Sequence, residues 1–308
     1  MTDSNGKRIL VMGGSGMLGH KLVQSWNTRF DVWTTLRGSF SNYERFGIFD
    51  EDKTVSNVRI DDFDSVVDAF ARSKPDVVVN CIGVIKQLKT AKDPIPTLTT
   101  NAVFPHRLAK LCRASGTRLI TLSTDCVFSG RTGNYTELDA PDAEDLYGRS
   151  KNMGEVAEEN CLTVRTSIIG RELESAHSLI EWFLSNRGGR VRGFTRAIYS
   201  GFPTVMLADI LANLIENYPQ LSGVRHVSSE PINKYELLLL TRKAYNLDIE
   251  IEPDDDFQID RSLDSSRFRR ETGFVPPTWE AMINRMAADE TPYDEWRKQF
   301  NESVKARS

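Results

Sequence analysis

The sequence contains no run of about 18 apolar residues, the length that a membrane-spanning helix requires. Its first eight residues, MTDSNGKR, also lack the apolar stretch of a secretory signal peptide. The formal net charge is −4, so we expect no general attraction to nucleic acid or to an anionic membrane. These absences predict a cytoplasmic protein that binds neither nucleic acid nor membranes.

Cysteine and histidine are also scarce. The four histidines are widely scattered, and the four cysteines (Cys81, Cys112, Cys126 and Cys161) show no paired spacing. A disulfide framework or a zinc site would need such pairs. We therefore predict no metal site, and the cysteine usage fits a reducing compartment.

What the sequence does contain is a regular alternation of strand and helix patterns. Its 308 residues are 40% hydrophobic, which is enough for a large core. The alternation predicts an α/β fold, with a doubly wound parallel sheet covered by helices on both faces. We expect strands at residues 8–13, 31–36, 77–79, 118–122 and 162–166, and helices from residue 18 and at 65–71, 103–115 and 150–159.

After about residue 169 the regular alternation of strand and helix patterns ends. This change predicts a smaller α/β substrate-binding region. Helices are expected at residues 178–185, 205–217, 234–245 and 278–288, strands at 225–228 and 249–252, and a loop at 253–257. We assign residues 1–168 to the large domain, with the chain returning to it around 202–228. The smaller region comprises residues 169–201 and 229–291, and residues 292–308 form a C-terminal tail.

A glycine-rich turn follows the first strand. Gly13, Gly16 and Gly19 allow a sharp turn and let a pyrophosphate approach the N-terminus of the next helix. The position in the first strand–helix unit favours a Rossmann-type dinucleotide site over a purely structural turn. The expected cofactor contacts here are Gly13, Ser15, Gly16, Met17, Leu18 and Gly19.

Arg37 follows the second strand, whose end faces the adenosine ribose in a dinucleotide-binding fold. An arginine at this place can neutralise a 2′-phosphate, whereas an acid would bind the 2′-hydroxyl. We therefore favour NADPH as the cofactor, with NADH as the alternative. A solvated surface arginine is the other interpretation of Arg37.

Tyr147 and Lys151 are spaced by one helical turn and share a helix face. A nearby ammonium would lower the pKa of the tyrosine, which could then exchange a proton with a carbonyl group. Thr124 lies at the end of a predicted strand, where open α/β sheets present their ligands. The alternative interpretation is that both side chains are simply exposed on the surface of a helix and have no catalytic role.

These motifs, in this order, resemble those of the extended short-chain dehydrogenases/reductases. The segments STDCVFSG (123–130), YGRSKNMGE (147–155) and RTSIIG (165–170) resemble the dTDP-4-dehydrorhamnose reductase family. The resemblance implies a homodimeric, NAD(P)H-dependent oxidoreductase that reduces the 4-keto group of a nucleotide-diphosphate 6-deoxysugar. It also implies roles for three residues: Tyr147 as general acid, Lys151 as its electrostatic partner, and Thr124 as the hydroxyl that orients the keto oxygen.

The resemblance extends to further residues. It implies that Cys81, Ile82 and Gly83 line the adenosine side of the cofactor crevice, and Asn101 matches an asparagine of the family, although a helix-start cap explains it nearly as well. The residues implied to contact substrate are Asp125, His177 and Arg196. His177 also fits an ordinary helix entry.

One residue departs from the family pattern. Cys126 stands where the related 4,6-dehydratases have glutamate and where reductases have tyrosine. It fits a small packed residue better than a nucleophile. Two alternatives to a reductase stay open: a nucleotide-sugar epimerase or reductive epimerase, and a non-catalytic dinucleotide-binding regulatory subunit, because the β subunit of methionine adenosyltransferase resembles this family.

Overall fold

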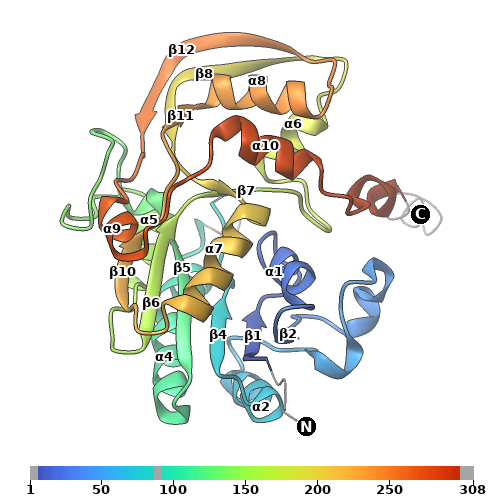
Figure 1. The fold of residues 1–308 in the computed structure, drawn as a ribbon, viewed down its shortest axis with the longest axis vertical. Helices are drawn as coiled ribbons and strands as arrows, with labels where there is room; N and C mark the ends of the chain where they lie inside the picture. The colour runs from blue at the N-terminus through green and yellow to red at the C-terminus, as the bar shows by residue number, and fades with distance from the viewer. Residues whose placement is uncertain (1–5, 87–91, 299–308) are drawn as a thin grey trace.

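The computed structural model describes residues 6–86 and 92–298, and its centre is a seven-stranded parallel sheet (Figure 1). The strand order is β10-β6-β5-β4-β1-β2-β3. The strands are β1 (Arg8–Met12), β2 (Asp31–Thr35), β3 (Thr54–Val55), β4 (Val77–Asn80), β5 (Arg118–Thr124), β6 (Cys161–Thr166) and β10 (Gly223–His226). The predicted doubly wound parallel sheet is confirmed.

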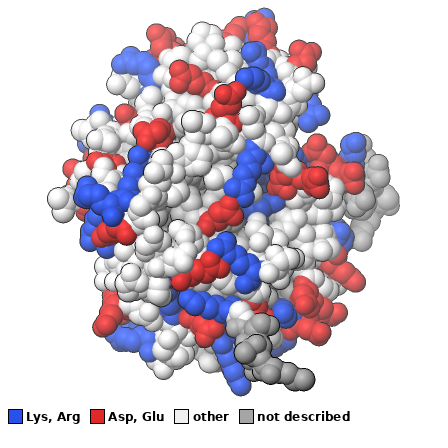
Figure 2. All heavy atoms as spheres, in the orientation of Figure 1, with Lys and Arg blue, Asp and Glu red and all other residues white. Residues whose placement is uncertain are grey.

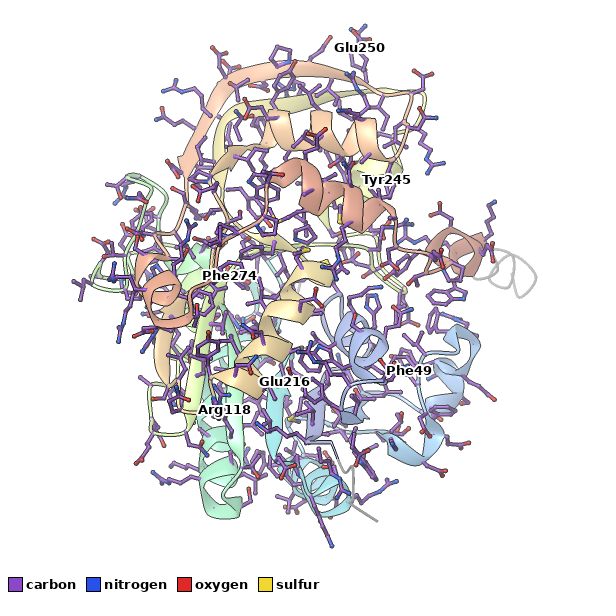
Figure 3. The ribbon with its side chains drawn as sticks, viewed as in Figure 1. Phe49, Arg118, Glu216, Tyr245, Glu250 and Phe274 are labelled. Atoms are coloured by element: carbon purple, nitrogen blue, oxygen red, sulfur yellow. The ribbon has the colours of Figure 1, made fainter. Side chains whose placement is uncertain are left out.

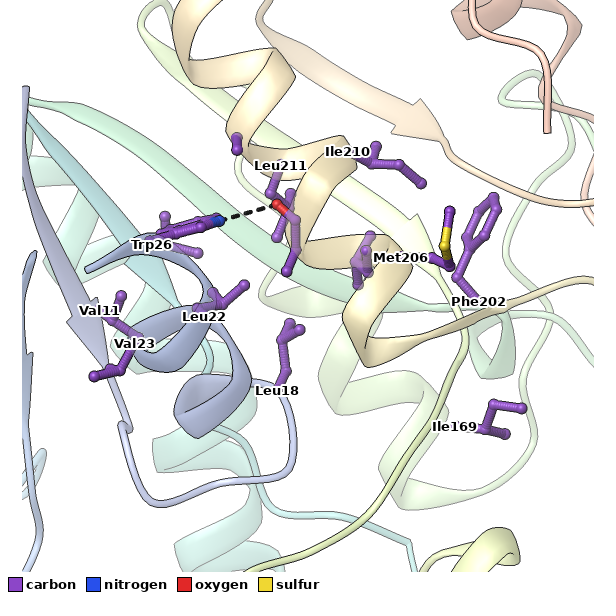
Figure 4. Close-up of a cluster of buried hydrophobic side chains, with 14 of the residues drawn as sticks. Val11, Leu18, Leu22, Val23, Trp26, Ile169, Phe202, Met206, Ile210 and Leu211 are labelled. Atoms are coloured by element: carbon purple, nitrogen blue, oxygen red, sulfur yellow. Dashed lines mark hydrogen bonds between the residues drawn. The ribbon is translucent and has the colours of Figure 1, made fainter. Parts of the chain in front are cut away.

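Helices cover both faces of the sheet because its strands are apolar on both sides. Ile9 and Val11 of β1 face a core formed with α1 (Gly19–Trp26) and α7 (Thr204–Asn217). Leu10 and Met12 face the opposite core, formed with α2 (Phe63–Ser73) and α4 (Phe104–Ser115). The indole nitrogen of Trp26 donates a 3.0 Å hydrogen bond to the Ala208 carbonyl and joins α1 to α7 (Figure 4).

The winding of the chain changes direction between β1 and β4. From β1 the chain builds outward to β2 and β3, whereas β4, β5, β6 and β10 extend the sheet on the other side. Ligands of open α/β sheets bind at such a reversal, beyond the carboxyl ends of the strands. The glycine-rich turn after β1 and the segment after β4 therefore border the expected crevice.

The C-terminal half contributes a second sheet, of order β11-β8-β12. Its strands are β8 (Arg190–Tyr199), β11 (Ile232–Asn233) and β12 (Glu250–Asp260), and its helices are α6 (Leu179–Leu184), α8 (Lys234–Ala244), α9 (Ser266–Thr272) and α10 (Trp279–Ala287). Two short strands, β7 (Ile168–Ile169) and β9 (Phe202–Pro203), pair at the junction with the large sheet. The predicted smaller α/β region is thus present.

The loop predicted at residues 253–257 is wrong, because these residues belong to β12. Acidic side chains of β12 pair with arginines on β8: Arg190 pairs with the exposed Glu250 and Glu252, and Arg192 pairs with the buried Asp254. Glu250 lies at the outer edge of the molecule in Figure 3. Charges that would repel each other in an isolated strand are therefore compensated by its neighbour.

The segment assigned to a C-terminal tail is part of the packed structure as far as residue 298. Residues 293–298 are helical, and Tyr293 and Trp296 are buried in the core around α1. Buried Arg171 and Glu181 hold this segment: Arg171 contacts Asp294, and Glu181 contacts Arg297. Residues 299–308 of the assigned tail lie outside the described residues.

Within residues 6–86 and 92–298, no helix is both long and apolar enough to cross a lipid bilayer. On the face drawn in Figure 2, acidic and basic side chains are interspersed over the surface. This face therefore presents no large field of one sign.

Candidate functional site

The glycine-rich turn has the geometry of a phosphate-binding loop. Gly13 has a φ of +84°, a conformation that glycine adopts without strain, and its carbonyl accepts a 3.1 Å hydrogen bond from the Gly16 amide. At Gly19, an added Cβ would lie 2.1 Å from the Gly13 oxygen, so only glycine lets α1 begin this close to the strand. Ser15, Gly16 and Met17 line the accessible side of the turn, whereas Leu18 is buried beneath it.

A buried histidine supports this turn from the protein side. His20 Nδ1 lies 2.8 Å from the Gly16 carbonyl oxygen and Nε2 lies 2.8 Å from the Tyr293 hydroxyl. Because a carbonyl can only accept, Nδ1 carries the proton and the Tyr293 hydroxyl donates to Nε2. Burial lowers the pKa of His20 to about 4, so the ring is neutral at physiological pH. The C-terminal segment thus contacts the turn through one neutral histidine.

The segment after β4, which includes the predicted cofactor contacts Cys81, Ile82 and Gly83, approaches the turn through Cys81 and Ile82. The Cys81 amide donates a hydrogen bond to the Met12 carbonyl. The Ile82 side chain packs against Gly13, where an added Cβ would lie only 3.0 Å from it. Asn101 fixes this segment from the π-helix Thr99–Val103: it accepts from the Val84 amide and donates to the Ser150 hydroxyl. The interpretation of Asn101 as a helix-start cap is therefore wrong.

Arg37 follows β2 and is exposed on the same edge of the sheet. The nearby Asp61 pairs with Arg59, and this pairing and the more distant charge of Arg37 hold the pKa of Asp61 below its usual range. Arg37 and Arg59 therefore both lie near Asp61, beyond the end of β2.

Tyr147 and Lys151 lie on α5 (Leu146–Met153), which begins four residues earlier and ends six residues earlier than predicted. The Asp145 carboxylate caps the helix by accepting from the Gly148 amide at 2.8 Å. An added Cβ on Gly148 would lie 2.2 Å from the Cys126 carbonyl oxygen, so glycine allows α5 to pack against the turn after β5. This close approach brings the phenol to Thr124.

Thr124 ends β5, and its hydroxyl has three polar neighbours. It donates to Asp125 Oδ1 at 3.0 Å and accepts from the Cys126 amide at 3.1 Å. Its third polar neighbour is the Tyr147 phenol, whose pKa this contact lowers. The structure therefore brings together Thr124 and Tyr147, which are 23 residues apart in the chain, and Lys151 follows one turn later on α5.

The expected lowering of the Tyr147 pKa is wrong for this structure. Burial raises the pKa of Tyr147 above its ordinary value, and the Thr124 hydrogen bond opposes this rise only in part. Burial also lowers the pKa of Lys151 to about 8, against the attraction of Glu155. Lys151 Nζ donates to the Leu122 carbonyl oxygen at 2.6 Å. The phenol is therefore protonated at neutral pH and can act as an acid.

Asp125 and Cys126 lie on the short 3₁₀ turn after β5, where Asp125 is buried and Cys126 is half-buried. Burial raises the pKa of Asp125, whereas the nearby Arg261 and Lys234 oppose the rise. Burial raises the pKa of the Cys126 thiol to about 12, which agrees with a packed residue rather than a thiolate nucleophile. Sequence reasoning missed Lys234 and Arg261, because neither lies in a motif.

The two other predicted substrate residues lie apart from this cluster. His177 is exposed just before the Ser178 cap of α6, and its amide donates to Glu172. Arg196 shares the exposed face of β8 with Arg190 and Arg192, opposite the face that α8 covers, and it bonds to Gln258. The structure therefore does not bring Arg196 to Tyr147.

Among residues 6–86 and 92–298, no group of three or more histidine, cysteine, aspartate or glutamate side chains is placed to hold a metal ion.

The amino-acid sequence is similar to those of two kinds of known protein. A methionine adenosyltransferase 2 subunit beta from Danio rerio is 28% identical over 253 residues, which span 78% of this chain and 75% of that protein. A dTDP-4-dehydrorhamnose reductase from Streptomyces griseus is 34% identical over 152 residues, but these span only 49% of this chain and 44% of that reductase.

Solved structures share the fold. A dTDP-4-dehydrorhamnose reductase from Bacillus anthracis, in complex with NADP, has a TM-score of 0.75 and 20% identity over 91% of this chain and 98% of that one. A hypothetical dTDP-4-dehydrorhamnose reductase from Sulfolobus tokodaii has a TM-score of 0.73 and 26% identity over 89% and 99%. Residues 7–291 match the family model described as the RmlD substrate binding domain. The chain therefore belongs to this family of extended short-chain dehydrogenases/reductases.

Proposed function

We propose that the protein is an NADPH-dependent reductase of a nucleotide-linked 4-keto-6-deoxysugar. The observation that carries the proposal is the approach of Tyr147 to Thr124, with Lys151 one turn later on α5, in a chain of this family that has a glycine-rich turn after β1. A cytoplasmic location and a homodimer belong to the same proposal. Exposed apolar side chains on neighbouring helical elements, Ile95, Val103 and Met153, support an assembly of two copies.

The residues around the turn fit a dinucleotide. Gly13, Gly16 and Gly19 would let a pyrophosphate approach the N-terminus of α1, and a Cβ at Gly19 would collide with the Gly13 carbonyl oxygen. Arg37 would meet a 2′-phosphate, Cys81 to Gly83 would line the adenosine side, and Lys151 would hold the nicotinamide ribose. The bound cofactor supplies the hydride for the carbonyl carbon.

The chain's own residues supply the proton. The Tyr147 phenol donates a hydrogen bond to the keto oxygen, and the Thr124 hydroxyl turns its one proton from Asp125 to the same oxygen. These two bonds orient the carbonyl and stabilise its growing negative charge. Because burial keeps the phenol protonated, Tyr147 can transfer its proton to this oxygen. The Lys151 ammonium then stabilises the phenolate until a solvent proton replaces the lost one.

The test is a screen of NADPH oxidation against UDP-, dTDP- and GDP-linked 4-keto-6-deoxysugars, with NMR identification of each product. We expect turnover of one nucleotide class. Product configuration and solvent deuterium at C3 or C5 separate simple reduction from reductive epimerisation. If the protein oxidises NADPH with none of the tested sugars as substrate, this result would contradict the proposal.

A second candidate is a non-catalytic subunit, which the similarity to methionine adenosyltransferase 2 subunit beta over 78% of the chain favours. This candidate predicts stable binding to a methionine adenosyltransferase catalytic chain and no turnover of any keto sugar. Co-purification of the two chains measures the first property, and the sugar screen measures the second.

We expect the proposed reductase to lose activity as the pH rises above about 8. Lys151 has a pKa of about 8, so its ammonium loses the proton in this range and no longer stabilises the phenolate. The pH profile of kcat/KM for the keto sugar measures the effect. A profile that stays flat up to pH 9.5 would show that the Lys151 charge is not needed.

We expect the Arg37→Ala change to weaken NADPH binding about 10- to 100-fold, because one charge-assisted contact to a phosphate is lost. NADH binding should change little. The dissociation constants are measurable by cofactor fluorescence. Arg113→Ala is the matched control, since this exposed arginine on α4 lies at the opposite edge of the sheet. An equal loss for both cofactors would contradict the assignment of Arg37.

A further inference from the structure

A buried carboxylate lies directly behind the Tyr147–Lys151 pair. Glu155 follows α5, and its side chain is only 7% exposed. Its Oε1 accepts hydrogen bonds from the Ser123 hydroxyl at 2.6 Å and from Arg165 Nε at 2.7 Å, and its Oε2 accepts from a second Arg165 nitrogen at 2.7 Å. Neither the cofactor contacts nor the proton transfer described above uses this carboxylate.

The partners of Glu155 are themselves fixed. Arg165 on β6 has a side chain that is 6% exposed, and its remaining nitrogen lies 3.1 Å from His226 Nε2. His226 Nδ1 lies 3.0 Å from the Tyr135 carbonyl oxygen, which can only accept. The proton is therefore on Nδ1, and Nε2 is free to accept from Arg165. The two bonds from Arg165, whose third nitrogen is also occupied, fix the Glu155 carboxylate in one position.

Ser123 joins this pair to the reacting groups. It stands between Leu122, whose carbonyl accepts the hydrogen bond of Lys151 at 2.6 Å, and Thr124, whose hydroxyl meets the phenol. A carboxylate that holds Ser123 therefore fixes the strand end that carries both groups. Burying a lysine ammonium is costly unless a negative charge lies nearby.

We infer that Glu155 is a positioning residue, whose buried charge keeps the Lys151 ammonium protonated and whose contact with Ser123 fixes Leu122 and Thr124 in place. This inference rests on the proposed function, because it gives Lys151 and Thr124 their roles. Glu155 raises the pKa of Lys151 against the lowering by burial. The other titratable group that acts on Lys151 is the Cys81 thiol, which is uncharged at neutral pH because burial raises its pKa to about 12.

The experiment titrates Lys151 directly by NMR of ¹⁵N-labelled lysine in the full chain, with Lys151→Met to identify the signal. In Glu155→Gln, we expect the pKa of Lys151 to fall by about one unit or more, the effect of removing a nearby opposite charge. Glu155→Asp keeps the charge and should restore most of the shift. Glu158→Gln is the matched control, since Glu158 lies three residues further on and pairs with exposed Arg113.

An unchanged pKa of Lys151 in folded Glu155→Gln would overturn the inference. If this variant does not fold because Arg165 is left unpaired, the double variant Glu155→Gln/Arg165→Met replaces it, and the same fall is expected. If neither variant folds, the Glu155 carboxylate is needed only for the stability of the fold, and the inference is overturned as well. The titration needs no substrate, so a protein that reduces no keto sugar but shows the shift would refute the proposed function and leave the role of Glu155 standing.

Discussion

Replacing Tyr147 by phenylalanine is expected to lower kcat for keto-sugar reduction by about 10²- to 10⁴-fold, the contribution of a well-placed general acid. The change removes one hydroxyl and leaves the ring in place, so α5 should keep its contact with the turn after β5. The dissociation constant for NADPH should change much less than kcat. Stopped-flow measurement of NADPH oxidation separates the two quantities.

Tyr218→Phe is the matched control for this experiment. Tyr218 follows α7 and donates its hydroxyl proton to the Thr272 carbonyl, which lies outside the Tyr147 cluster. Loss of that hydroxyl should leave kcat unchanged. If Tyr147→Phe still oxidised NADPH at the normal rate, the phenol could not be the proton donor.

The second large effect concerns stability. Glu181 is completely buried on α6, and its carboxylate accepts from Arg171 at 2.8 Å, from the Glu172 amide at 2.8 Å and from Arg297. Glu181→Gln would leave two guanidinium groups without their buried counter-charge. We expect a loss of about 3 kcal/mol in the free energy of unfolding, as for other broken buried pairs.

Urea unfolding followed by tryptophan fluorescence measures this loss. The control is Glu250→Gln, which removes the carboxylate of an exposed pair with Arg190. Exposed pairs contribute little, so the unfolding midpoint of this control should not move. Equal midpoints for Glu181→Gln and the natural protein would show that the pair contributes nothing to stability.

The sequence was sufficient to predict features that local spacing encodes. The turn from Gly13 to Gly19 and the pair Tyr147/Lys151 each lie within seven residues, and the apolar runs of the central strands are short and continuous. The α/β alternation followed from these runs. The solved relatives with TM-scores of 0.73 and 0.75 share the resulting fold.

Features that depend on partners far along the chain were not predictable in this way. The acidic residues of β12 suggested a loop, because the arginines that compensate them lie about 60 residues earlier on β8. Lys234 lies near Asp125 only in the folded chain, and the pKa of Tyr147 depends on burial that the local lysine spacing does not reveal.

The contact between His20 and Tyr293 has a consequence for the order of events during biosynthesis. His20 and the Tyr293 hydroxyl that it contacts are 273 residues apart in the chain. A nascent chain lacks this support for the turn until Tyr293 has left the ribosome. We therefore expect tight dinucleotide capture only after this residue has emerged.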